Sequence, residues 1–431
     1  MHRTHYIKKA KENPGKTAKI AGWVHDVRDL GKLKFVLVRD VTGIIQVTMK
    51  KGAVEQGMLE SAEVNKEDVV AFEGEIKENK IAPDGVEMVP SSFQMLNPVQ
   101  KKLPVDPTGH VHSELDTRLD YRYIDLRRQD VSLIFKTKSV CVRAFREKLK
   151  ELDFIEIHPS AISGAATEGG ADVFPVQYFE NKAFLVQSPQ LYKQLAVIGG
   201  FDRVVMTVPV FRAEKHNTSS HLNEITQMDI EMGFADHRDA MDVLEKVTLH
   251  MLKRAKEEVG DEIAETFKKE VAVPNKIRKH TYSELVDELG KNGFEMKHGW
   301  DFTREAEKKL EELLGEELYF IYDWPTEVRA FYSMPDRENE EICHAFDLLY
   351  RGLEISSGAK RIHLPEVLEK QLKKRGLDPV DFEFYIKAFR MGAPPHAGWS
   401  IGLERFVMNL CNQENIREAM LFPRDRTRLM P

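Results

Sequence analysis

The sequence predicts an α+β protein in two parts, a small N-terminal β-barrel and a larger domain of helices and strands. Three observations support this fold class. Short alternating strands separated by turn residues fill the first hundred residues, and a proline-rich stretch follows them. Beyond that stretch, strongly amphipathic helices alternate with longer strands. The 431 residues are enough for two or three domains with a large core.

The N-terminal domain is predicted to span residues 1–104. From Lys16 to Leu96, β-branched residues alternate with polar ones in five strand-like segments, and a short helix fits between Val54 and Val64. Five strands and one helix within fewer than a hundred residues favour a barrel of the OB type over an edge domain of the β-sandwich class.

The larger domain is predicted to span residues 131–431, after a hinge at 105–130. The hinge is expected because three prolines fall between Asn97 and His112. Two long amphipathic helices follow, one from Leu133 to Leu152 and one that Asp236 would cap. A charged, helical segment at about 260–325 is predicted to be a small insertion.

Composition excludes several classes of protein. Three cysteines, far apart in the sequence, argue against a zinc cluster or a disulfide framework and indicate a reducing cytoplasm. No apolar run reaches membrane-spanning length, and the N-terminus lacks the apolar core of a signal peptide, so we expect a cytoplasmic protein without membrane contact. The net charge is −7, so a nucleic-acid site would have to be a local patch.

The strongest chemical signal lies between Val208 and Phe234. A strand ends at Arg212, a polar loop follows, and a second strand carries Gln227, Asp229 and Glu231 at alternate positions. Alternate residues share one face of a strand, and the intervening residues are apolar. The pattern predicts a packed face and a polar working face beside Arg212, which can clamp a phosphate. The alternative is a solvated outer face of a sheet.

Two later segments carry further chemistry. Glycines between Gly392 and Leu410 would let the backbone approach a flat ligand, and Arg405 at a helix start can stack on a base or hold a phosphate. The segment from Ala345 to Arg361 is predicted to be a hairpin. It would bring together Asp347, Glu354 and Ser357, whose oxygens suit Mg²⁺.

Taken in order, these segments resemble motif 2, the metal-binding hairpin and motif 3 of the class II aminoacyl-tRNA synthetases. The stretch from Arg118 to Arg128 resembles the start of the catalytic domain in the aspartyl, asparaginyl and lysyl subgroup, and the barrel fits that subgroup's anticodon-binding module. The resemblance covers essentially the whole chain. It implies an antiparallel class II β-sheet flanked by helices, and a homodimer. Motif 1 departs from the family pattern, because Pro159 stands one place early.

Within this subgroup the chain looks like an archaeal-type aspartyl enzyme, because the region between motifs 2 and 3 is short and the chain ends soon after motif 3. Aspartyl enzymes carry Gln-Leu-Tyr-Lys where this chain has residues 190–193, whereas asparaginyl enzymes have an uncharged residue at the lysine and lysyl enzymes need acidic residues. Lys193 with Arg361 would make a doubly cationic pocket that suits a second carboxylate. Taken alone, Lys193 would be a surface lysine on a helix.

The resemblance assigns most of these residues to ligands. L-Aspartate would contact Glu168, Gln190, Leu191, Tyr192, Lys193, Arg212, Asp229, Ser357, Arg361 and His396. ATP would contact Arg212, Ala213, Glu214, Ser220, His221, Leu222, Glu354, Gly402, Leu403, Glu404 and Arg405. Mg²⁺ would bind Glu354 and Ser357, with Asp347 as a further candidate. The implied reaction joins aspartate to the α-phosphate of ATP and then transfers the aspartyl group to the tRNA 3′-OH.

The barrel would read the anticodon. The predicted residues are Phe35 as a stacking platform and Gln46 as a base reader, with Arg28, Glu78, His25 and Pro83 nearby. Phe35 as a core residue is the alternative. Archaeal-type enzymes restricted to tRNA(Asp) tend to have tryptophan at the position of His25 and lysine at that of Pro83. Histidine and proline resemble the non-discriminating form, which charges tRNA(Asp) and tRNA(Asn).

Several alternatives stay open at this point. An enzyme restricted to tRNA(Asp) follows if His25 and Pro83 are ordinary substitutions in a strand and a turn. An asparaginyl enzyme is a second alternative, and a catalytically inactive relic is a third, although relics usually lose Arg212, Glu354 or Arg405. A tRNA-independent asparagine synthetase would lack the barrel. The non-discriminating form implies an amidotransferase that acts on Asp-tRNA(Asn).

Overall fold

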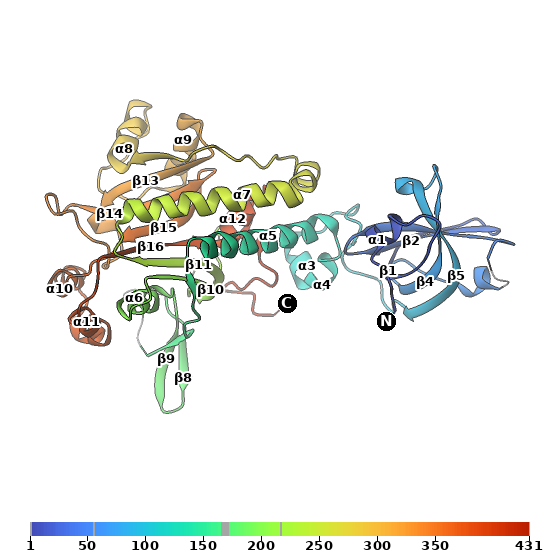
Figure 1. Cartoon of the computed structure of the whole chain (residues 1–431), viewed down its shortest axis with the longest axis horizontal. Coiled ribbons are helices and arrows are strands. Elements are labelled where there is room, and N and C mark those ends of the chain that lie inside the picture. Colours follow the sequence, from blue (N-terminus) through green and yellow to red (C-terminus); the bar gives the residue numbers. More distant parts are fainter. Residues whose placement is uncertain (1, 55–56, 165–171, 216–217, 431) are drawn as a thin grey trace. The chain divides into compact units, whose positions relative to one another are not determined.

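The computed structural model describes residues 2–54, 57–164, 172–215 and 218–430 (Figure 1). The chain divides into two compact units, Met1–His112 and Ser113–Pro431. The segment 105–130, in which we predicted a hinge, spans this boundary. Its residues from 113 onward belong to the second unit, where they form the short helices α3 (Leu115–Asp120) and α4 (Arg122–Asp125).

The first unit is a closed barrel with the strand order β1-β2-β3-β5-β4. Its elements are α1 (Ile7–Lys11), β1 (Thr17–Asp29), β2 (Leu33–Asp40), β3 (Gly43–Lys50), α2 (Met58–Ser61), β4 (Val69–Glu78), the 3₁₀ turn η1 (Pro83–Gly85) and β5 (Val86–Asn97). Alternate strand residues such as Ile20, Val36, Val47 and Phe72 fill the core. The predicted five-stranded barrel is therefore confirmed.

The second unit is built on an eight-stranded sheet with the order β12-β13-β14-β15-β16-β11-β10-β6. The strands are β6 (Ile155–Glu156), β10 (Arg203–Phe211), β11 (Glu224–Gly233), β12 (Arg278–Thr281), β13 (Leu318–Pro325), β14 (Ile342–Tyr350), β15 (Glu354–Lys360) and β16 (His396–Gly402). Neighbours pair antiparallel from β13 to β10, and the outermost pairs are parallel. A smaller sheet joins β7 (Ile162–Ser163), β9 (Asn181–Leu185) and β8 (Pro175–Tyr178).

Two long helices, α5 (Gln129–Glu151) and α7 (His237–Phe267), lie side by side over one face of this sheet (Figure 1). Phe145 of α5 and Leu244 of α7 share one core cluster with the strand residues Ile230 and Trp399. Asp236 caps α7 as predicted, because its carboxylate accepts hydrogen bonds from the first-turn amides. The other helices are α6 (Gln190–Ile198), α8 (Tyr282–Lys291), α9 (Arg304–Leu314), α10 (Pro365–Lys374), α11 (Glu383–Phe389) and α12 (Leu403–Leu410).

Residues 260–325, where we predicted a small helical insertion, hold more than helices. They contain the end of α7, then α8 and α9, and also β12 and β13, which extend the main sheet at one edge. Tyr282, Leu310 and Trp324 form a separate core there. Across the described ranges, each helix is too short or too polar to cross a membrane.

The centre of the sheet requires glycine at one crowded position. Gly358 of β15 lies opposite Phe346 of β14, and a Cβ atom on it would lie 2.4 Å from the Phe346 ring and 2.8 Å from the carbonyl oxygen of Gly398. Real Cβ atoms do not approach so closely, so the aromatic ring would have to move within a packed core.

We expect Gly358→Ala to lower the free energy of unfolding by about 1–3 kcal/mol through overpacking. Gly290→Ala is the matched control, since Gly290 lies in α8 and its Cβ would have no neighbour within 4 Å. Alanine there should stabilise the helix by about 0.5–1 kcal/mol. Urea denaturation of both variants checks the pair, and equal stabilities would contradict the packing argument.

Candidate active site

A cavity of about 310 Å³ lies on the face of the eight-stranded sheet that α5 and α7 leave open. Most of the residues predicted from widely separated segments meet around it. The predicted residues that line it are Gln190, Lys193, Arg212, Glu214, Ser220, His221, Leu222, Asp229, Glu354, Ser357, Arg361, Gly402, Glu404 and Arg405. The motifs that the sequence suggested therefore converge on one place.

Strand register creates a polar row across this face. Asp229 of β11 pairs with Ser400 of β16, Ser400 with Ser357 of β15, and Ser357 with Asp347 of β14. The Ser400 hydroxyl donates a hydrogen bond to Asp229 Oδ2 over 3.1 Å. Asp229 is only 1% exposed, so the predicted polar face is a buried one and not the solvated outer face of the alternative.

At the inner end of the row, two cations face two carboxylates. Lys193 Nζ donates to Asp229 Oδ1 over 2.7 Å and to the carbonyl oxygen of Trp399 over 3.2 Å. Arg361 Nε donates to Glu231 Oε1 over 3.0 Å. All four charged side chains are at most 4% exposed. The structure thus pairs the two predicted cations with two carboxylates of the predicted polar strand face.

The two carboxylates have different proton affinities. Burial raises the pKa of Asp229, and the charge of Lys193 offsets this only in part. Burial also acts on Glu231, but Arg361 and Lys193 together hold the pKa of Glu231 below its usual value. Glu231 is therefore a fixed negative charge, whereas Asp229, which lines the cavity, is the carboxylate open to a ligand cation.

Arg405 ties the opposite wall of the cavity together. Its guanidinium donates to the carbonyl oxygens of Ser220 over 3.3 Å and of Glu354 over 3.0 Å. A third donor lies 3.1 Å from His221 Nε2. Burial, then Arg405, lower the pKa of His221, so its neutral ring accepts this hydrogen bond and donates from Nδ1 to Thr218 Oγ1. Within the described ranges, the guanidinium of Arg212 makes no hydrogen bond, so it is available to an anion.

The predicted metal hairpin forms, with one difference. Glu354 and Ser357 line the cavity, but Asp347 does not. The Asp347 carboxylate instead contacts the guanidinium of Arg329, a residue that the sequence patterns did not reveal. Burial raises the pKa of Asp347 to about 7 in spite of this arginine. A cation of the protein thus already stands beside Asp347.

Five other predicted residues do not line this cavity. Leu191 and Leu403 are core residues, Tyr192 lies on another side of α6, and Ala213 lines a neighbouring hollow. His396 is fully buried between Gln194, 2.9 Å away, and the carbonyl oxygen of Pro394, so it lies behind the pocket that it was expected to close. The predicted motifs are runs of consecutive residues, but only one side of each helix or strand faces the cavity, so some residues of each run point elsewhere. Glu168 falls in 165–171, outside the described residues.

The predicted anticodon residues lie in the barrel. Arg28 pairs with Phe35, and Phe35 pairs with Thr48 on the next strand. Gln46 donates to Thr48 Oγ1 and to Glu87, each over 3.1 Å. Phe35 is only half-buried and alternates with the core residue Val36, so it points away from the core. The side chains of Glu78 and Pro83 are exposed near the β4–β5 turn.

His25 is a fixed part of the barrel. It lies at a β-bulge between Val24 and Asp26, and its Nδ1 is 2.8 Å from Arg39 Nη1. Arg39 in turn makes a buried ion pair with Glu67, in which Nη2 of the arginine lies 2.8 and 2.9 Å from the two carboxylate oxygens. Burial, then Arg39, lower the pKa of His25, so its neutral ring accepts the arginine's hydrogen bond.

We expect Glu231→Gln to cost about 3–5 kcal/mol of unfolding free energy at pH 7, because Arg361 would stay buried without its carboxylate. The folded pKa of Glu231 is lowered from 4.5, so its contribution is fully present above pH 4.5 and is lost as the pH falls through the folded pKa. The difference in unfolding free energy between the wild type and Glu231→Gln should therefore become smaller in acid. Urea denaturation at pH 7 and below pH 4.5 measures it, with Glu180→Gln in an exposed turn as the control. Equal stabilities at pH 7 would contradict this account.

Comparison with known proteins places the chain in a family. A family model for class II tRNA synthetases (D, K and N) matches residues 114–426, and one for the OB-fold nucleic acid binding domain matches residues 18–96, as the barrel prediction required.

The Aspartate--tRNA(Asp/Asn) ligase of Methanocaldococcus jannaschii is 48% identical over 100% of this chain and 98% of its own length. The Aspartate--tRNA(Asp) ligase of Pyrococcus furiosus is 47% identical over 100% of both chains. The structure of asparaginyl-tRNA synthetase from Pyrococcus horikoshii with asparaginyl-adenylate has a TM-score of 0.94 and 32% identity, with 100% of both chains covered. The chain therefore belongs to the class II tRNA synthetases of the D, K and N group.

Proposed function

We propose that the chain is an aspartate–tRNA ligase that charges both tRNA(Asp) and tRNA(Asn). The observation that carries the proposal is the inner end of the cavity, where Lys193 and Arg361 are buried beside Asp229 and Glu231. The names of full-length relatives at 46–48% identity, such as the Aspartate--tRNA(Asp/Asn) ligases of Methanocaldococcus jannaschii and Methanothermobacter thermautotrophicus, support the same activity.

L-Aspartate matches the charges of this pocket. Its ammonium group would pair with Asp229, and Glu168 is a second candidate for that role. Its side-chain carboxylate would pair with Lys193 and Arg361, which use only part of their donors on the described protein groups. An asparagine amide would bring no charge to these cations, and a lysine ammonium would be repelled by them. Gln190 and Ser357 would complete the walls.

ATP would occupy the wall between Arg212 and Arg405. We assign Arg212 to the α-phosphate, Glu214 to the adenine, and Ser220, His221 and Leu222 to the rest of the ATP surface. Gly402, which has no side chain, would let ATP approach the backbone there. Glu404 would act indirectly, because its carboxylate is held by Lys138 at 2.6 Å and by the amide of Thr226 at 2.9 Å.

Class II synthetases use ATP with divalent metal ions. Glu354 and Ser357 fit Mg²⁺, since both offer oxygen atoms to the same cavity. When bound, Mg²⁺ would supply positive charge for the phosphate oxygens. Asp347, which lies outside the cavity lining, is a further candidate for this ion, since one of its carboxylate oxygens is buried without a hydrogen-bond partner in the described part of the chain.

The reaction that these residues would support has two steps. The α-carboxylate of aspartate attacks the α-phosphorus of ATP, which gives aspartyl-adenylate and releases pyrophosphate. The 3′-OH of the tRNA then attacks the aspartyl carbonyl and releases AMP. Arg212 would stabilise the charge that develops on the α-phosphate. The fixed charges at the inner end of the cavity would hold aspartate in line, so positioning supplies much of the rate.

The barrel would select the tRNA. Phe35 offers a half-buried ring that points away from the core, on which an anticodon base can stack, beside Arg28 and Gln46. Relatives named for tRNA(Asp/Asn) and for tRNA(Asp) alone are almost equally similar, so overall identity does not decide between them. His25 favours the broader activity, because it accepts a hydrogen bond from Arg39, which a tryptophan indole cannot do. Charging tRNA(Asn) with aspartate implies an amidotransferase partner.

We also propose a cytoplasmic homodimer. Three cysteines are buried and free, which suits a reducing compartment. The edge strand β6, in the motif 1 region, is open to pairing and carries Ile155 with 50% exposure. This region would form the interface between subunits.

Aspartate-dependent ATP–pyrophosphate exchange tests the activity. Lys193→Met should lower kcat/KM for aspartate by about 10⁴-fold, because the site is built to pair the substrate's carboxylate. Tyr192→Phe, one residue away on α6 and outside the cavity lining, should leave the exchange unchanged. Absence of exchange by the wild-type protein would refute the enzyme proposal, and exchange with asparagine in place of aspartate would refute the amino-acid assignment.

Aminoacylation of two transcripts tests the tRNA range. Anticodons that end in C, for tRNA(Asp), or in U, for tRNA(Asn), should be charged with comparable kcat/KM. His25→Trp combined with Pro83→Lys should restore a preference for C of about 5–150-fold, the value of one good base contact. His2→Trp, on the exposed N-terminus of the same unit, is the control. A wild-type preference for C of several orders of magnitude would favour the enzyme restricted to tRNA(Asp).

A further inference from the structure

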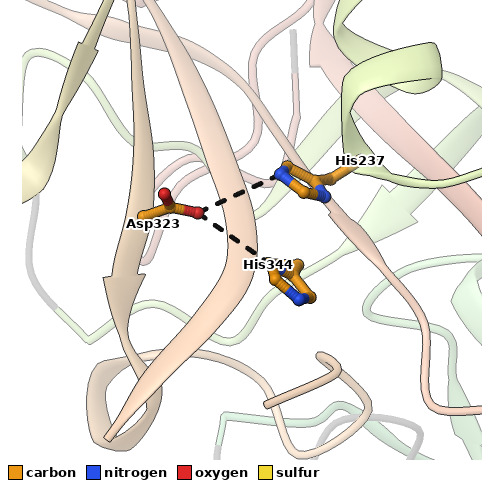
Figure 2. Close-up of side chains that lie close together, drawn as sticks. All are labelled: His237, Asp323 and His344. Carbon is orange, nitrogen blue, oxygen red and sulfur yellow. Dashed lines mark ion pairs between the residues drawn. The ribbon is translucent and has the colours of Figure 1, made fainter. Parts of the chain in front are cut away.

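A second group of ligating side chains lies on the second unit, outside the lining of the cavity. His237 at the start of α7, Asp323 of β13 and His344 of β14 place one ligand atom each within 4.8 Å of one another (Figure 2). We call this group the His–Asp–His cluster. We propose that it binds a divalent transition-metal ion, with Zn²⁺ as the representative ion.

The spacing suits one shared ion better than direct hydrogen bonds. Asp323 Oδ1 lies 4.0 Å from His237 Nε2 and 4.0 Å from His344 Nδ1, as the dashed lines in Figure 2 mark. These distances are too long for hydrogen bonds. Two ligands of a tetrahedral Zn²⁺, with bonds of about 2.0–2.1 Å, lie about 3.4 Å apart. A closure of about 0.6 Å would therefore bring Asp323 to ligand spacing with each histidine, and the two histidine nitrogens, within 4.8 Å of each other, would also have to approach.

One imidazole nitrogen of the cluster has no other partner in the part of the chain that the structure describes. His237 is only 6% exposed, and the nitrogen that it turns toward Asp323 is Nε2. Nδ1 of His344, which faces Asp323, is buried without a hydrogen-bond partner in the described ranges. Buried polar atoms are almost always satisfied, so this nitrogen of His344 points to a missing partner.

The rings of His237 and His344 stack with centroids 4.6 Å apart and planes 10° apart, so one ring would turn toward the other to share an ion.

A second carboxylate orients one of the ligands. His344 Nε2 lies 3.4 Å from Asp336 Oδ2, while its Nδ1 faces the cluster. A histidine that faces a metal with one nitrogen and a carboxylate with the other is the usual outer-shell arrangement of metal-bound histidines. Two imidazoles and one carboxylate favour Zn²⁺ and similar ions over Mg²⁺, which prefers oxygen ligands.

An ion can reach the cluster from solvent. The side chains of His344 and Asp323 are 22% and 33% exposed, and Asp323 also lines a hollow beside Tyr282 and His298. The ion would join the first turn of α7 to β13 and β14. Because Ala345 of β14 lines the cavity, the metal would brace one wall of the candidate active site without contributing to its chemistry.

Direct metal binding tests the proposal without reference to aminoacylation. The full-length protein is stripped with a chelator, supplied with excess Mg²⁺ to fill oxygen sites, and titrated with Zn²⁺ by calorimetry and with Co²⁺ by visible absorption. We expect one ion per chain. Asp323→Asn should weaken binding at least 10-fold and His344→Ala at least 100-fold. Asp336→Asn should weaken it about 10-fold.

The choice of variants keeps the test decisive. Asp323 has a φ of +58°, a conformation that asparagine tolerates, so Asp323→Asn preserves the backbone even if His344→Ala does not fold. His280→Asn is the matched control, because His280 of β12 also faces a carboxylate, that of Glu316 at 3.1 Å, but has no third ligand among the described residues. Wild-type protein without micromolar Zn²⁺ affinity, or Asp323→Asn with unchanged affinity, would overturn the proposal.

Discussion

The burial of two ion pairs on one face of the sheet is the constraint on which the candidate active site depends. Lys193 with Asp229 and Arg361 with Glu231 are almost completely withdrawn from water, so each charge needs its partner and further hydrogen bonds. Strand β11 supplies the two carboxylates, and strand β16 supplies further hydrogen bonds. The carbonyl oxygens of Gly398 and Trp399 accept from the two cations, and Gly398 leaves room for the Glu231 carboxylate, which a Cβ atom would approach to 2.4 Å.

This arrangement makes the pocket selective by pattern and not by net charge. The two cations and two carboxylates balance one another in the free protein, so the site does not attract anions in general. In the function that we propose, the ligand presents an ammonium group to Asp229 and a carboxylate to Lys193 and Arg361 at the same time. The fixed charge of Glu231 keeps Arg361 oriented while the ligand exchanges with water, which is the preorganisation that binding and catalysis both need.

Local periodicity in the sequence predicted the parts of this site that depend on one element alone. The alternation of Gln227, Asp229 and Glu231 already implied a polar strand face, and the barrel followed from strand lengths and turns. Contacts between distant elements could not be predicted in this way. Arg329 beside Asp347, His396 behind the pocket and the three elements of the His–Asp–His cluster depend on strand register, which one sequence does not specify. Continuous motifs also overstated the site, because Leu191 and Leu403 turn into the core.

The position that we propose for tRNA choice, His25, is tied into the structure of the barrel. His25 lies at a bulge that turns two successive residues, His25 and Asp26, away from the core, on the side where Phe35 and Gln46 lie. Its accepting nitrogen is committed to Arg39, which Glu67 holds in place. A tryptophan there would add a donor and a larger ring but no acceptor, so Arg39 would lose a partner while the surface gained a new contact for a base. If His25 contributes to tRNA choice as we propose, recognition there is coupled to a buried ion pair, and a change in tRNA range requires the strand to accommodate both effects.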